Sequence, residues 1–228
     1  MTTPLEQLLV GVGVIFDMDG VIVDSYEPHL ESWRMLAREI GAEVTEEQFA
    51  GTFGRTSRDI IRTLFGETDN AKVRQYDDRK ESLYRDLVRG RLPMMPGVRS
   101  LVRTLSAAGA RIAIGSSGPR ENVELVCSSA DLMIFVDARI SGADVTHGKP
   151  DPEVFIRAAN TLGLKPSQCI VVEDAPVGIQ AAHAGGMKCI CLRSPRSPKG
   201  IESADLIVDS LEEITIARLV ELFGSEPI

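Results

Sequence analysis

The 228-residue chain lacks long hydrophobic runs, and nothing in it approaches the ~18 consecutive apolar residues that a membrane-spanning helix requires. The most apolar stretch near its start, residues 8–16, follows Glu6 rather than a basic segment and leads directly into Asp17. Neither feature is typical of a secretory signal. We therefore expect a cytoplasmic protein with no membrane partner.

Positive charge is also scarce. The chain has 25 Lys and Arg against 33 Asp and Glu, which gives a net charge of −8. Arg193, Arg196 and Lys199 form only a sparse basic cluster between prolines. A surface of this charge repels nucleic acid and anionic membranes. We expect no nucleic-acid partner, and a negatively charged substrate must be attracted by a local site.

Cysteine is sparse as well, with four residues scattered through the chain. Cys169, Cys189 and Cys191 lie inside apolar runs that are typical of buried strands, and Cys189 and Cys191 do not have the spacing of metal ligands. These cysteines are predicted to pack in the core. Free buried thiols are consistent with a reducing cytoplasm.

Histidine is equally rare, since His29, His147 and His183 are the only three. No strand-turn-helix nucleophile elbow accompanies them, so the sequence does not support a hydrolase with a Ser-His-Asp triad. Gly11 and Gly13 lie at the start of their predicted strand rather than after its end. This order excludes a dinucleotide-binding fingerprint.

What the chain does contain is an alternation of short apolar segments with helical patterns. The predicted strands are residues 10–16, 111–115, 138–141, 169–172, 188–192 and 206–208. Strands that alternate with helices predict βαβ units and a parallel sheet covered on both faces. We predict an α/β fold with a doubly wound, Rossmann-like core formed by residues 1–25 and 93–228.

Residues 26–92 interrupt this alternation, because they carry helical patterns and no convincing strand. Leu30, Trp33, Ala37 and Ile40, for example, share one face of a predicted helix. We predict that this segment is an all-helical cap domain inserted after the first strand.

The residues that follow the predicted strands are the first candidates for a site, because ligands of open parallel sheets bind beyond the carboxyl ends of the strands. These residues are Asp17, Asp19, Ser116, Ser117, Glu173 and Asp174, with Lys149 on the long loop after the third strand.

Asp17 ends the first predicted strand, and Asp19 follows two residues later with Gly20 allowing a close turn. Phosphate monoesters are inert and anionic, so an enzyme must neutralise charge and supply a nucleophile. A carboxylate such as Asp17 can do so beside a divalent cation, forming an aspartyl-phosphate. Asp19 is placed to act as general acid and base on the same phosphorus.

The Asp-x-Asp-Gly pattern has two other interpretations. A plain turn remains an alternative at this point. A calcium loop does not, because Val21 and Pro28 occupy the fifth and twelfth loop positions, where oxygen ligands are expected.

Glu173 and Asp174 form a pair of adjacent acids between a predicted strand and a helix. Their mutual repulsion calls for a compensating cation, so together with Asp17 they predict a metal site. A donor set made only of oxygen favours Mg²⁺ over Zn²⁺. A helix N-cap is the alternative interpretation of Asp174 alone.

Three further residues are candidates for binding phosphate. The Ser116 hydroxyl and the backbone N–H groups near it precede a helix and could hold a phosphate oxygen, with an N-cap as the alternative. Arg120 in the first helical turn could add a charged contact. Lys149 lies between Gly148 and Pro150, which would hold its charge in place, although a lone loop lysine is ordinarily solvated.

Together, residues 16–21, 115–117, 148–152 and 172–174 resemble, in order and spacing, the four motifs of the haloacid dehalogenase superfamily. The resemblance covers nearly the whole chain, including the cap. It implies that Asp17 is the nucleophile, that Asp19 is the acid and base, and that Ser116 and Lys149 hold the phosphate. It also implies that Mg²⁺ is surrounded by Asp17, Glu173, Asp174 and the backbone carbonyl of Asp19. We further expect Gly20 and Ser117 to contact substrate.

Within this superfamily, the dehalogenases lack the second aspartate and use no metal, so Asp19 points to phosphate chemistry. Residues 24–29 and Trp33 resemble β-phosphoglucomutase and the sugar-phosphate phosphatases related to it. Where the mutase has a lysine after a serine, this chain has Gly-Pro-Arg at residues 118–120, and Arg120 is more similar to the phosphatases. We expect a Mg²⁺-dependent phosphatase acting on a small phosphorylated metabolite, with a sugar phosphate as the expected class.

Two alternatives to a phosphatase remain at this point. The nearer one is a β-phosphoglucomutase-like phosphotransferase, and the more remote one is a non-catalytic regulator that binds sugar phosphate. We expect a monomer or a small homo-oligomer.

The cap supplies further candidates for binding substrate. Lys80 interrupts an apolar stripe, so it either extends its stem along the cap with the ammonium in water or faces the substrate. His29 is either a substrate contact or a packed residue at a helix start. Arg55 and Arg58 are both candidates for a phosphate contact.

Overall fold

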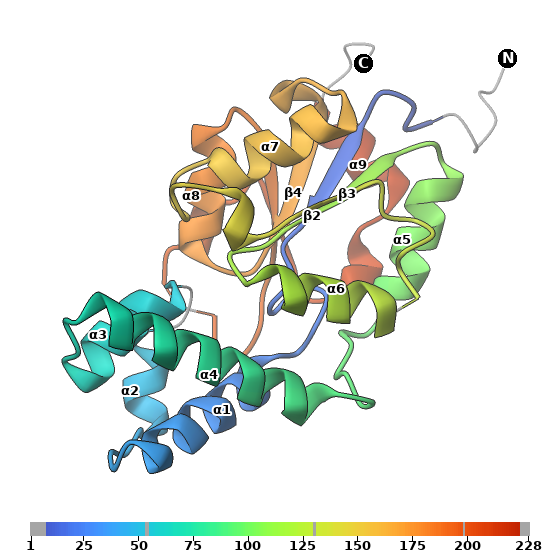
Figure 1. Cartoon of the computed structure of the whole chain (residues 1–228). Coiled ribbons are helices and arrows are strands. Elements are labelled where there is room, and N and C mark those ends of the chain that lie inside the picture. The colour runs from blue at the N-terminus through green and yellow to red at the C-terminus, as the bar shows by residue number, and fades with distance from the viewer. Residues whose placement is uncertain (1–7, 53–54, 130, 198, 224–228) are drawn as a thin grey trace, which may run out of the picture. The chain divides into compact units, whose positions relative to one another are not determined.

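The structure, a computed structural model, describes residues 8–52, 55–129, 131–197 and 199–223. They form two compact units (Figure 1). The core unit comprises the described residues up to Val23 and from Met94 onward, and the cap unit is Asp24–Pro93. These boundaries were predicted from the sequence to follow residues 25 and 92. None of the described helices is both long enough and apolar enough to cross a lipid bilayer.

The core unit is built on a parallel sheet that has six strands among the described residues. The strands are β1 (Gly13–Phe16), β2 (Arg111–Gly115), β3 (Ala138–Ile140), β4 (Cys169–Glu173), β5 (Lys188–Leu192) and β6 (Leu206–Val208). Their order, β3-β2-β1-β4-β5-β6, runs outward from β1 in both directions. This arrangement confirms the predicted doubly wound α/β core.

The first strand is shorter than predicted, because it begins at Gly13 rather than at residue 10. Gly11 has φ +85°, and the Val12 N–H donates to the Leu9 carbonyl at 3.1 Å. A residue in this left-handed conformation interrupts extended backbone. Residues 8–11 therefore form a turn that leaves Val10 exposed.

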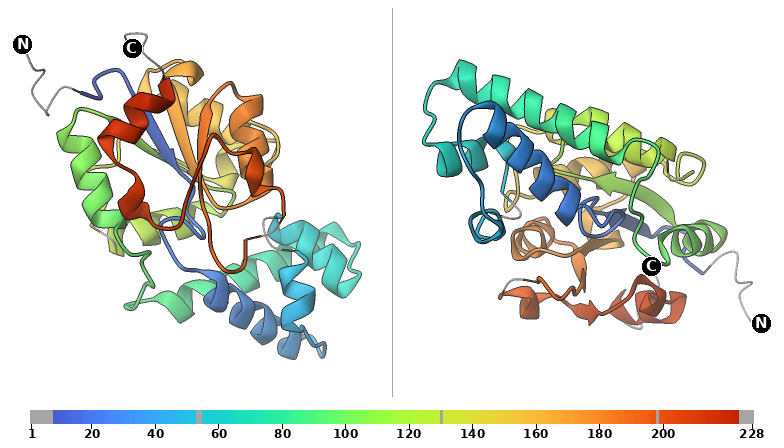
Figure 2. Two further views of the ribbon diagram at one scale, coloured as in Figure 1. Left: turned by 180° about the vertical axis from the view of Figure 1, so that it is seen from behind. Right: turned by 90° about the horizontal axis from the view of Figure 1, so that it is seen from below.

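Helices cover both faces of the sheet. On one face, α7 (Glu153–Leu162) and α8 (Pro176–Ala184) pack against the strands in a single hydrophobic cluster that includes Phe155 and Ile179. The opposite face carries α5 (Val98–Ala107) and α9 (Ile216–Phe223) (Figure 2). The remaining core helix, α6 (Arg120–Ser129), connects β2 to β3. Short 3₁₀ helices occur at η2 (Gly142–Asp144), η3 (Pro166–Gln168), η4 (Ile201–Ser203) and η5 (Leu211–Glu213).

The cysteines contribute to this packing. Cys169, Cys189 and Cys191 lie fully buried in the cluster beneath α7 and α8, and Cys127 is buried on α6. Burial raises the pKa of the Cys169 thiol to about 11 and that of Cys191 to about 12. These thiols are protonated packing groups, so the predicted packing role is confirmed.

The cap unit consists of helices in its described part: α1 (Tyr26–Glu39), α2 (Glu46–Ala50), α3 (Ser57–Phe65) and α4 (Asn70–Val88). The apolar faces of α1, α3 and α4 meet in one cluster around Trp33, with Leu30, Ile61 and Leu83. Thr45 begins α2 with a reciprocal capping box, because its hydroxyl accepts from the Gln48 N–H and the Gln48 amide accepts from the Thr45 N–H.

Candidate active site

Three polar side chains start from the same edge of the sheet, where its parallel strands end. Asp17 follows β1, and its N–H donates to the Val172 carbonyl at 2.9 Å. Ser116 follows β2, and its N–H donates to the Ile140 carbonyl at 3.0 Å. Glu173 is the last residue of β4. Backbone pairing within the sheet therefore brings these three residues to the same edge, independently of contacts between their side chains.

Lys149 joins two of these acids in a buried ion cluster. Its Nζ donates to Asp17 Oδ1 and to Glu173 Oε1, both at 2.6 Å. The Lys149 side chain is only 5% exposed, and Nζ lies 4.7 Å from the centre of the Phe155 ring. The alternative of a solvated loop lysine is therefore wrong for this residue.

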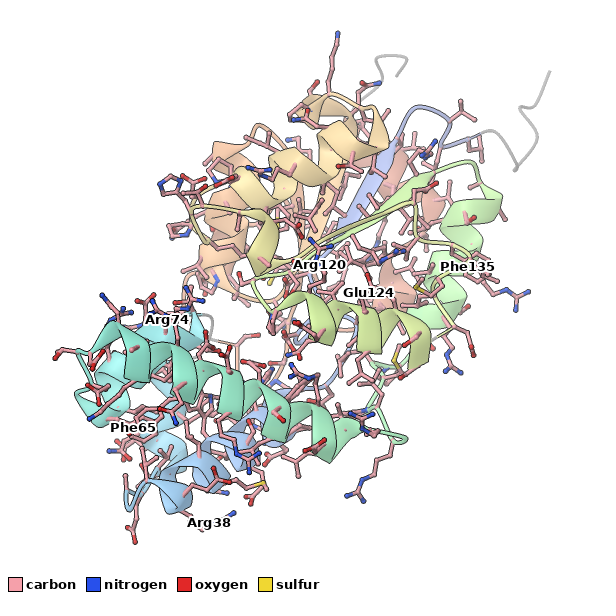
Figure 3. The ribbon with its side chains drawn as sticks, viewed as in Figure 1. Arg38, Phe65, Arg74, Arg120, Glu124 and Phe135 are labelled. Carbon is pink, nitrogen blue, oxygen red and sulfur yellow. The ribbon has the colours of Figure 1, made fainter. Side chains whose placement is uncertain are left out.

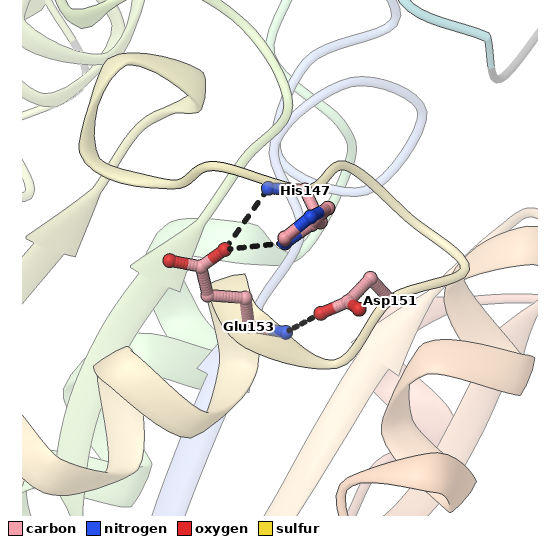
Figure 4. Close-up of side chains that lie close together, drawn as sticks. All are labelled: His147, Asp151 and Glu153. Carbon is pink, nitrogen blue, oxygen red and sulfur yellow. Dashed lines mark hydrogen bonds and ion pairs between the residues drawn. The ribbon is translucent and has the colours of Figure 1, made fainter.

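The loop that carries Lys149 is held by acids at the start of α7 (Figure 4). The Glu153 carboxylate accepts hydrogen bonds from the N–H groups of Thr146 and His147 at 2.8 and 2.9 Å, and the Asp151 carboxylate accepts from the Glu153 N–H at 2.9 Å. The peptide bond between Lys149 and Pro150 is cis. The supporting role of Glu153 and Asp151 was not predicted from the sequence, where their only signal is a pair of acids at a predicted helix start.

His147, Asp151 and Glu153 also place potential metal-ligating atoms within 4.8 Å of one another. The Glu153 carboxylate, however, already accepts hydrogen bonds from the two backbone N–H groups and also from Arg157 Nε at 2.8 Å. We interpret this exposed group as one that stabilises the loop carrying Lys149.

Glu173 is held from a second side by the backbone. Its Oε2 accepts from the N–H groups of Asp174 and Ala175 at 2.6 and 2.7 Å, while Oε1 accepts from Lys149. These donors precede α8, which begins at Pro176. Glu173 therefore links the end of β4 and the start of α8 to the lysine.

Asp174 differs from its neighbour, because its carboxylate accepts no hydrogen bond from the described part of the chain. It lies against Gly20, where a Cβ atom would be 2.0 Å from Asp174 Oδ2. Gly20 has φ +79°, so both its conformation and this contact require glycine. Asp17, Glu173 and Asp174 place one carboxylate oxygen each within 4.8 Å of one another.

The charge of this cluster is unbalanced. Burial, together with the neighbouring Glu173 and Asp19 carboxylates, raises the pKa of Asp17 to about 7 against the opposing effect of Lys149. Burial and the Glu173 and Asp17 carboxylates also raise the pKa of Asp174 well above its ordinary value. One ammonium does not neutralise three buried acids, so the site fits a cation. An all-oxygen donor set is the kind that Mg²⁺ prefers.

The side chains of Asp19 and Ser116 both lie close to Gly118. A Cβ atom at Gly118 would lie 3.2 Å from Ser116 Oγ and 3.9 Å from Asp19 Oδ2. Ser116 is buried, and its Oγ accepts from the Gly118 N–H at 3.0 Å. This bond closes a turn before α6 begins at Arg120, so Ser116 is not the N-cap of that helix.

Arg120 has a partner of its own. Arg120, which is labelled in Figure 3, donates its guanidinium hydrogens to the Asp144 carboxylate, which also accepts from the Ser141 hydroxyl at 2.6 Å. The Arg120 side chain is 57% exposed. The ion pair with Asp144 thus links Arg120 to η2.

The cap unit contains a second buried lysine. Lys80 Nζ lies 2.7 Å from His29 Nδ1, donates to Glu81 Oε1 at 2.9 Å, and lies 5.1 Å from the centre of the Trp33 ring. The Lys80 side chain is 2% exposed, so the alternative in which its ammonium reaches water is wrong. His29 stacks on Tyr84 with 4.1 Å between ring centres, and it is therefore a packed residue.

Glu81 balances this lysine and was missed by the sequence analysis. It also accepts from the Ser57 hydroxyl at 2.8 Å. Burial alone would raise the pKa of Glu81, but the Lys80 ammonium, with His29 and Ser57, lowers it to about 2. The only sequence signal was an opposite charge next to a lysine in an apolar stripe.

The two cap arginines differ in their partners. Arg58 Nε donates to Asp77 Oδ2 at 3.0 Å. Arg55 makes no ion pair with the residues described in the structure, and it is exposed.

Comparison with known proteins places this site in a family. Residues 14–192 match the family described as haloacid dehalogenase-like hydrolase. The chain is 31% identical over 209 residues to hexitol phosphatase A of Escherichia coli K12, an alignment that covers 90% of this chain and 94% of the relative. It is 28% identical over 216 residues to beta-phosphoglucomutase of Bacillus subtilis, with 91% and 93% covered.

A longer relative matches along the same region. The chloroplastic 5-amino-6-(5-phospho-D-ribitylamino)uracil phosphatase of Arabidopsis thaliana is 32% identical over 221 residues, which is 94% of this chain and 58% of that protein. The chain thus spans a little over half the length of that relative.

Among solved structures, beta-phosphoglucomutase from Clostridium difficile superposes with a TM-score of 0.83 at 23% identity, covering 94% of this chain and 97% of that one. This likeness supports the fold alone. The match over residues 14–192 and the named relatives show the family: the chain belongs to the haloacid dehalogenase-like hydrolases, in the branch of the sugar-phosphate phosphatases and β-phosphoglucomutase.

Proposed function

We propose that this protein is a Mg²⁺-dependent phosphatase that removes the phosphoryl group from a small phosphorylated sugar, with Asp17 as the nucleophile. The observation that carries this proposal is the buried convergence of Asp17, Asp174 and Lys149 at the carboxyl edge of the sheet. The relative named hexitol phosphatase A supports the substrate class.

Asp17, Asp174 and the backbone carbonyl of Asp19 are the residues to which we assign Mg²⁺. Glu173 is a further candidate ligand, although Lys149 and two backbone N–H groups already hold its carboxylate. When bound there, Mg²⁺ would neutralise the excess negative charge and let an anionic nucleophile approach an anionic phosphate.

Asp17 Oδ1 accepts from Lys149, so we assign the attack to the other oxygen, Oδ2. A bond forms between Asp17 Oδ2 and phosphorus as the ester P–O bond breaks, and Asp19 donates a proton to the leaving alcohol. In the second step, Asp19 takes a proton from a water that attacks the same phosphorus. The bond to Asp17 then breaks and inorganic phosphate leaves.

Ser116, Ser117 and Lys149 are proposed to hold the phosphate oxygens during both steps, next to the turn at Gly20. A buried ammonium stabilises developing charge more strongly than a solvated one. Arg120 already donates to Asp144, so we assign it to the support of η2 rather than to the phosphate.

Of the cap candidates, Arg55 is proposed to bind the part of the substrate beyond its phosphate, because His29 is stacked on Tyr84 and Lys80 is buried against Glu81. Arg55 is favoured over Arg58, because Arg58 is held by Asp77. We further propose that the enzyme is cytoplasmic and works as a monomer or a small homo-oligomer.

A phosphotransferase like β-phosphoglucomutase is the second candidate function. The similarity to the Bacillus subtilis mutase over most of both chains favours it. Both reactions share the phosphorylated Asp17, and they differ in whether water or a second sugar phosphate receives the phosphoryl group.

The test is a panel of phosphorylated metabolites assayed for released phosphate, with Mg²⁺ and after chelation. A phosphatase releases phosphate from one or more sugar phosphates, and chelation abolishes the release. Formation of an isomer from a sugar 1-phosphate with added sugar bisphosphate, without net phosphate release, would establish the mutase instead. Binding of sugar phosphates without turnover would indicate a regulator.

A further inference from the structure

The first turns of α8 contain a glycine whose missing side chain makes room for the Glu173 carboxylate. A Cβ atom at Gly178 would lie 1.7 Å from Glu173 Oε1, 2.0 Å from Cδ and 2.6 Å from Cγ. Gly178 lies inside the helix and has no left-handed φ, so the backbone conformation does not require glycine there. Glycine is unfavourable in a helix interior relative to alanine. The contact with Glu173 is therefore the feature that explains it.

The carboxylate that occupies this space cannot move aside freely. Its Oε2 is fixed by the N–H groups of Asp174 and Ala175, and its Oε1 accepts from Lys149 Nζ at 2.6 Å. Glu173 is 1% exposed, so protein atoms surround it. A methyl group at position 178 would press on Oε1, the oxygen that faces the lysine.

Lys149 would transmit this displacement to the nucleophile, because the same Nζ donates to Asp17 Oδ1 at 2.6 Å. We propose that Gly178 is a positioning residue for catalysis: it lets the Glu173 carboxylate lie against α8 and thereby holds Lys149 at the distance from Asp17 that the reaction requires. This inference rests on the proposed function of Asp17 and Lys149.

The principal variant is Gly178→Ala, and Gly51→Ala is its matched control. Gly51 has φ −67°, and the nearest atoms to a Cβ there lie at 3.6 Å, an ordinary van der Waals contact. Displacing a reacting group by about 1 Å can lower activity about 10²-fold. We expect Gly178→Ala to lower kcat/KM for an aryl phosphate by about that factor with an unchanged circular dichroism spectrum, and Gly51→Ala to leave kcat/KM unchanged.

A double-mutant cycle with Glu173→Ala separates positioning from a general effect on the helix. Without the carboxylate, the added methyl has nothing to displace, so Gly178→Ala is expected to cause no further loss of kcat/KM. An equal loss in both backgrounds, or wild-type activity of Gly178→Ala, overturns the proposal.

Urea unfolding of the same four proteins tests the contact itself, whatever the activity. Gly178→Ala should lower the unfolding midpoint in the wild type and leave it unchanged or raise it in the Glu173→Ala background. If Gly178→Ala does not fold, the shorter acid in Glu173→Asp/Gly178→Ala should restore folding, and failure to do so overturns the proposal. A wild-type protein that hydrolyses no phosphoester would refute the proposed function, while the unfolding cycle would still decide the contact.

Discussion

Each unit of this chain buries an ion cluster around one lysine, and the two clusters differ in how their charge is balanced. In the core unit, Lys149 pairs with Asp17 and Glu173, Asp174 is a third acid beside them, and the pKa of Asp17 is raised to about 7. In the cap unit, Lys80 faces Glu81, whose pKa is lowered to about 2. The comparison shows that burial alone does not decide what a charged group does.

The physical difference lies in whether the negative charge of each cluster is already compensated by an ammonium group. A buried acid with an ammonium beside it has its partner, and removing that partner leaves an uncompensated charge. A buried cluster with more acids than ammonium groups is stabilised by protonation or by a bound cation. We therefore expect the cap cluster to act on stability and the core cluster to act on ion binding and reactivity.

The largest expected effect is that of Asp17→Asn. The amide keeps the shape of the side chain but cannot attack phosphorus, so kcat should fall by roughly 10³-fold or more. Stability should not fall with it, because a neutral group replaces a buried acid. Measured kcat for an aryl phosphate, with the urea midpoint as a control, checks this. Activity within tenfold of the wild type would refute the role of Asp17 as the nucleophile.

The balanced cluster should respond in the opposite way to removal of its lysine. Lys80→Met leaves Glu81 buried without its ammonium and should lower the free energy of unfolding by about 3–5 kcal/mol. Trp33, the only tryptophan of the chain, is buried in the cap and reports its unfolding by fluorescence. The control is Lys80→Met/Glu81→Gln, in which no buried charge remains and most of the loss should be recovered. Equal destabilisation of the single and the double variant would contradict the stabilising role of the Lys80–Glu81 ion pair.

Acid should weaken the cap for the same reason. The pKa of Glu81 is about 2 in the folded cap and 4.5 ordinarily, so its contribution to stability is present above pH 4.5 and is lost as the pH falls toward 2. A difference of this size corresponds to roughly 3 kcal/mol. Trp33 fluorescence across this range should show a loss of cap stability that Glu81→Gln lacks. The same acid response in both proteins would contradict this assignment.

The smallest effect should come from an ion pair of the cap that water surrounds. Arg79 donates to Glu39 with two nitrogens, at 2.9 and 2.6 Å, yet the two side chains are 47% and 41% exposed. Exposed pairs contribute little to stability. Arg79→Ala should therefore leave the Trp33 unfolding midpoint nearly unchanged, and a loss as large as that of Lys80→Met would remove the distinction between exposed and buried pairs.

The two clusters also differ in how well the sequence predicts them. Asp17, Ser116 and Glu173 end apolar strands, and the rule that ligands bind at the carboxyl ends of parallel strands places all three at one edge. Strand pairing is thus enough to bring them together, and the doubly wound core follows from the alternation of strands and helices.

Contacts made by individual side chains could not be predicted in this way. Lys149 lies in a loop with no periodicity, and its partners Asp17 and Glu173 are 132 and 24 positions away. Glu81 is adjacent to Lys80, where helix periodicity would place it on another face. Gly178 opposes helix propensity, and only the position of the Glu173 carboxylate explains it.

The central claim is that the excess acids of the core cluster hold a divalent cation next to the nucleophile. Calorimetric titration of the metal-free protein with Mg²⁺ at neutral pH tests it most directly, with Asp174→Asn as the variant and Arg79→Ala as the control. We expect one ion per chain in the wild type and the control, and at least about tenfold weaker binding in Asp174→Asn, since each tenfold change corresponds to about 1.4 kcal/mol. Equal Mg²⁺ affinity in Asp174→Asn and the wild type would contradict the claim.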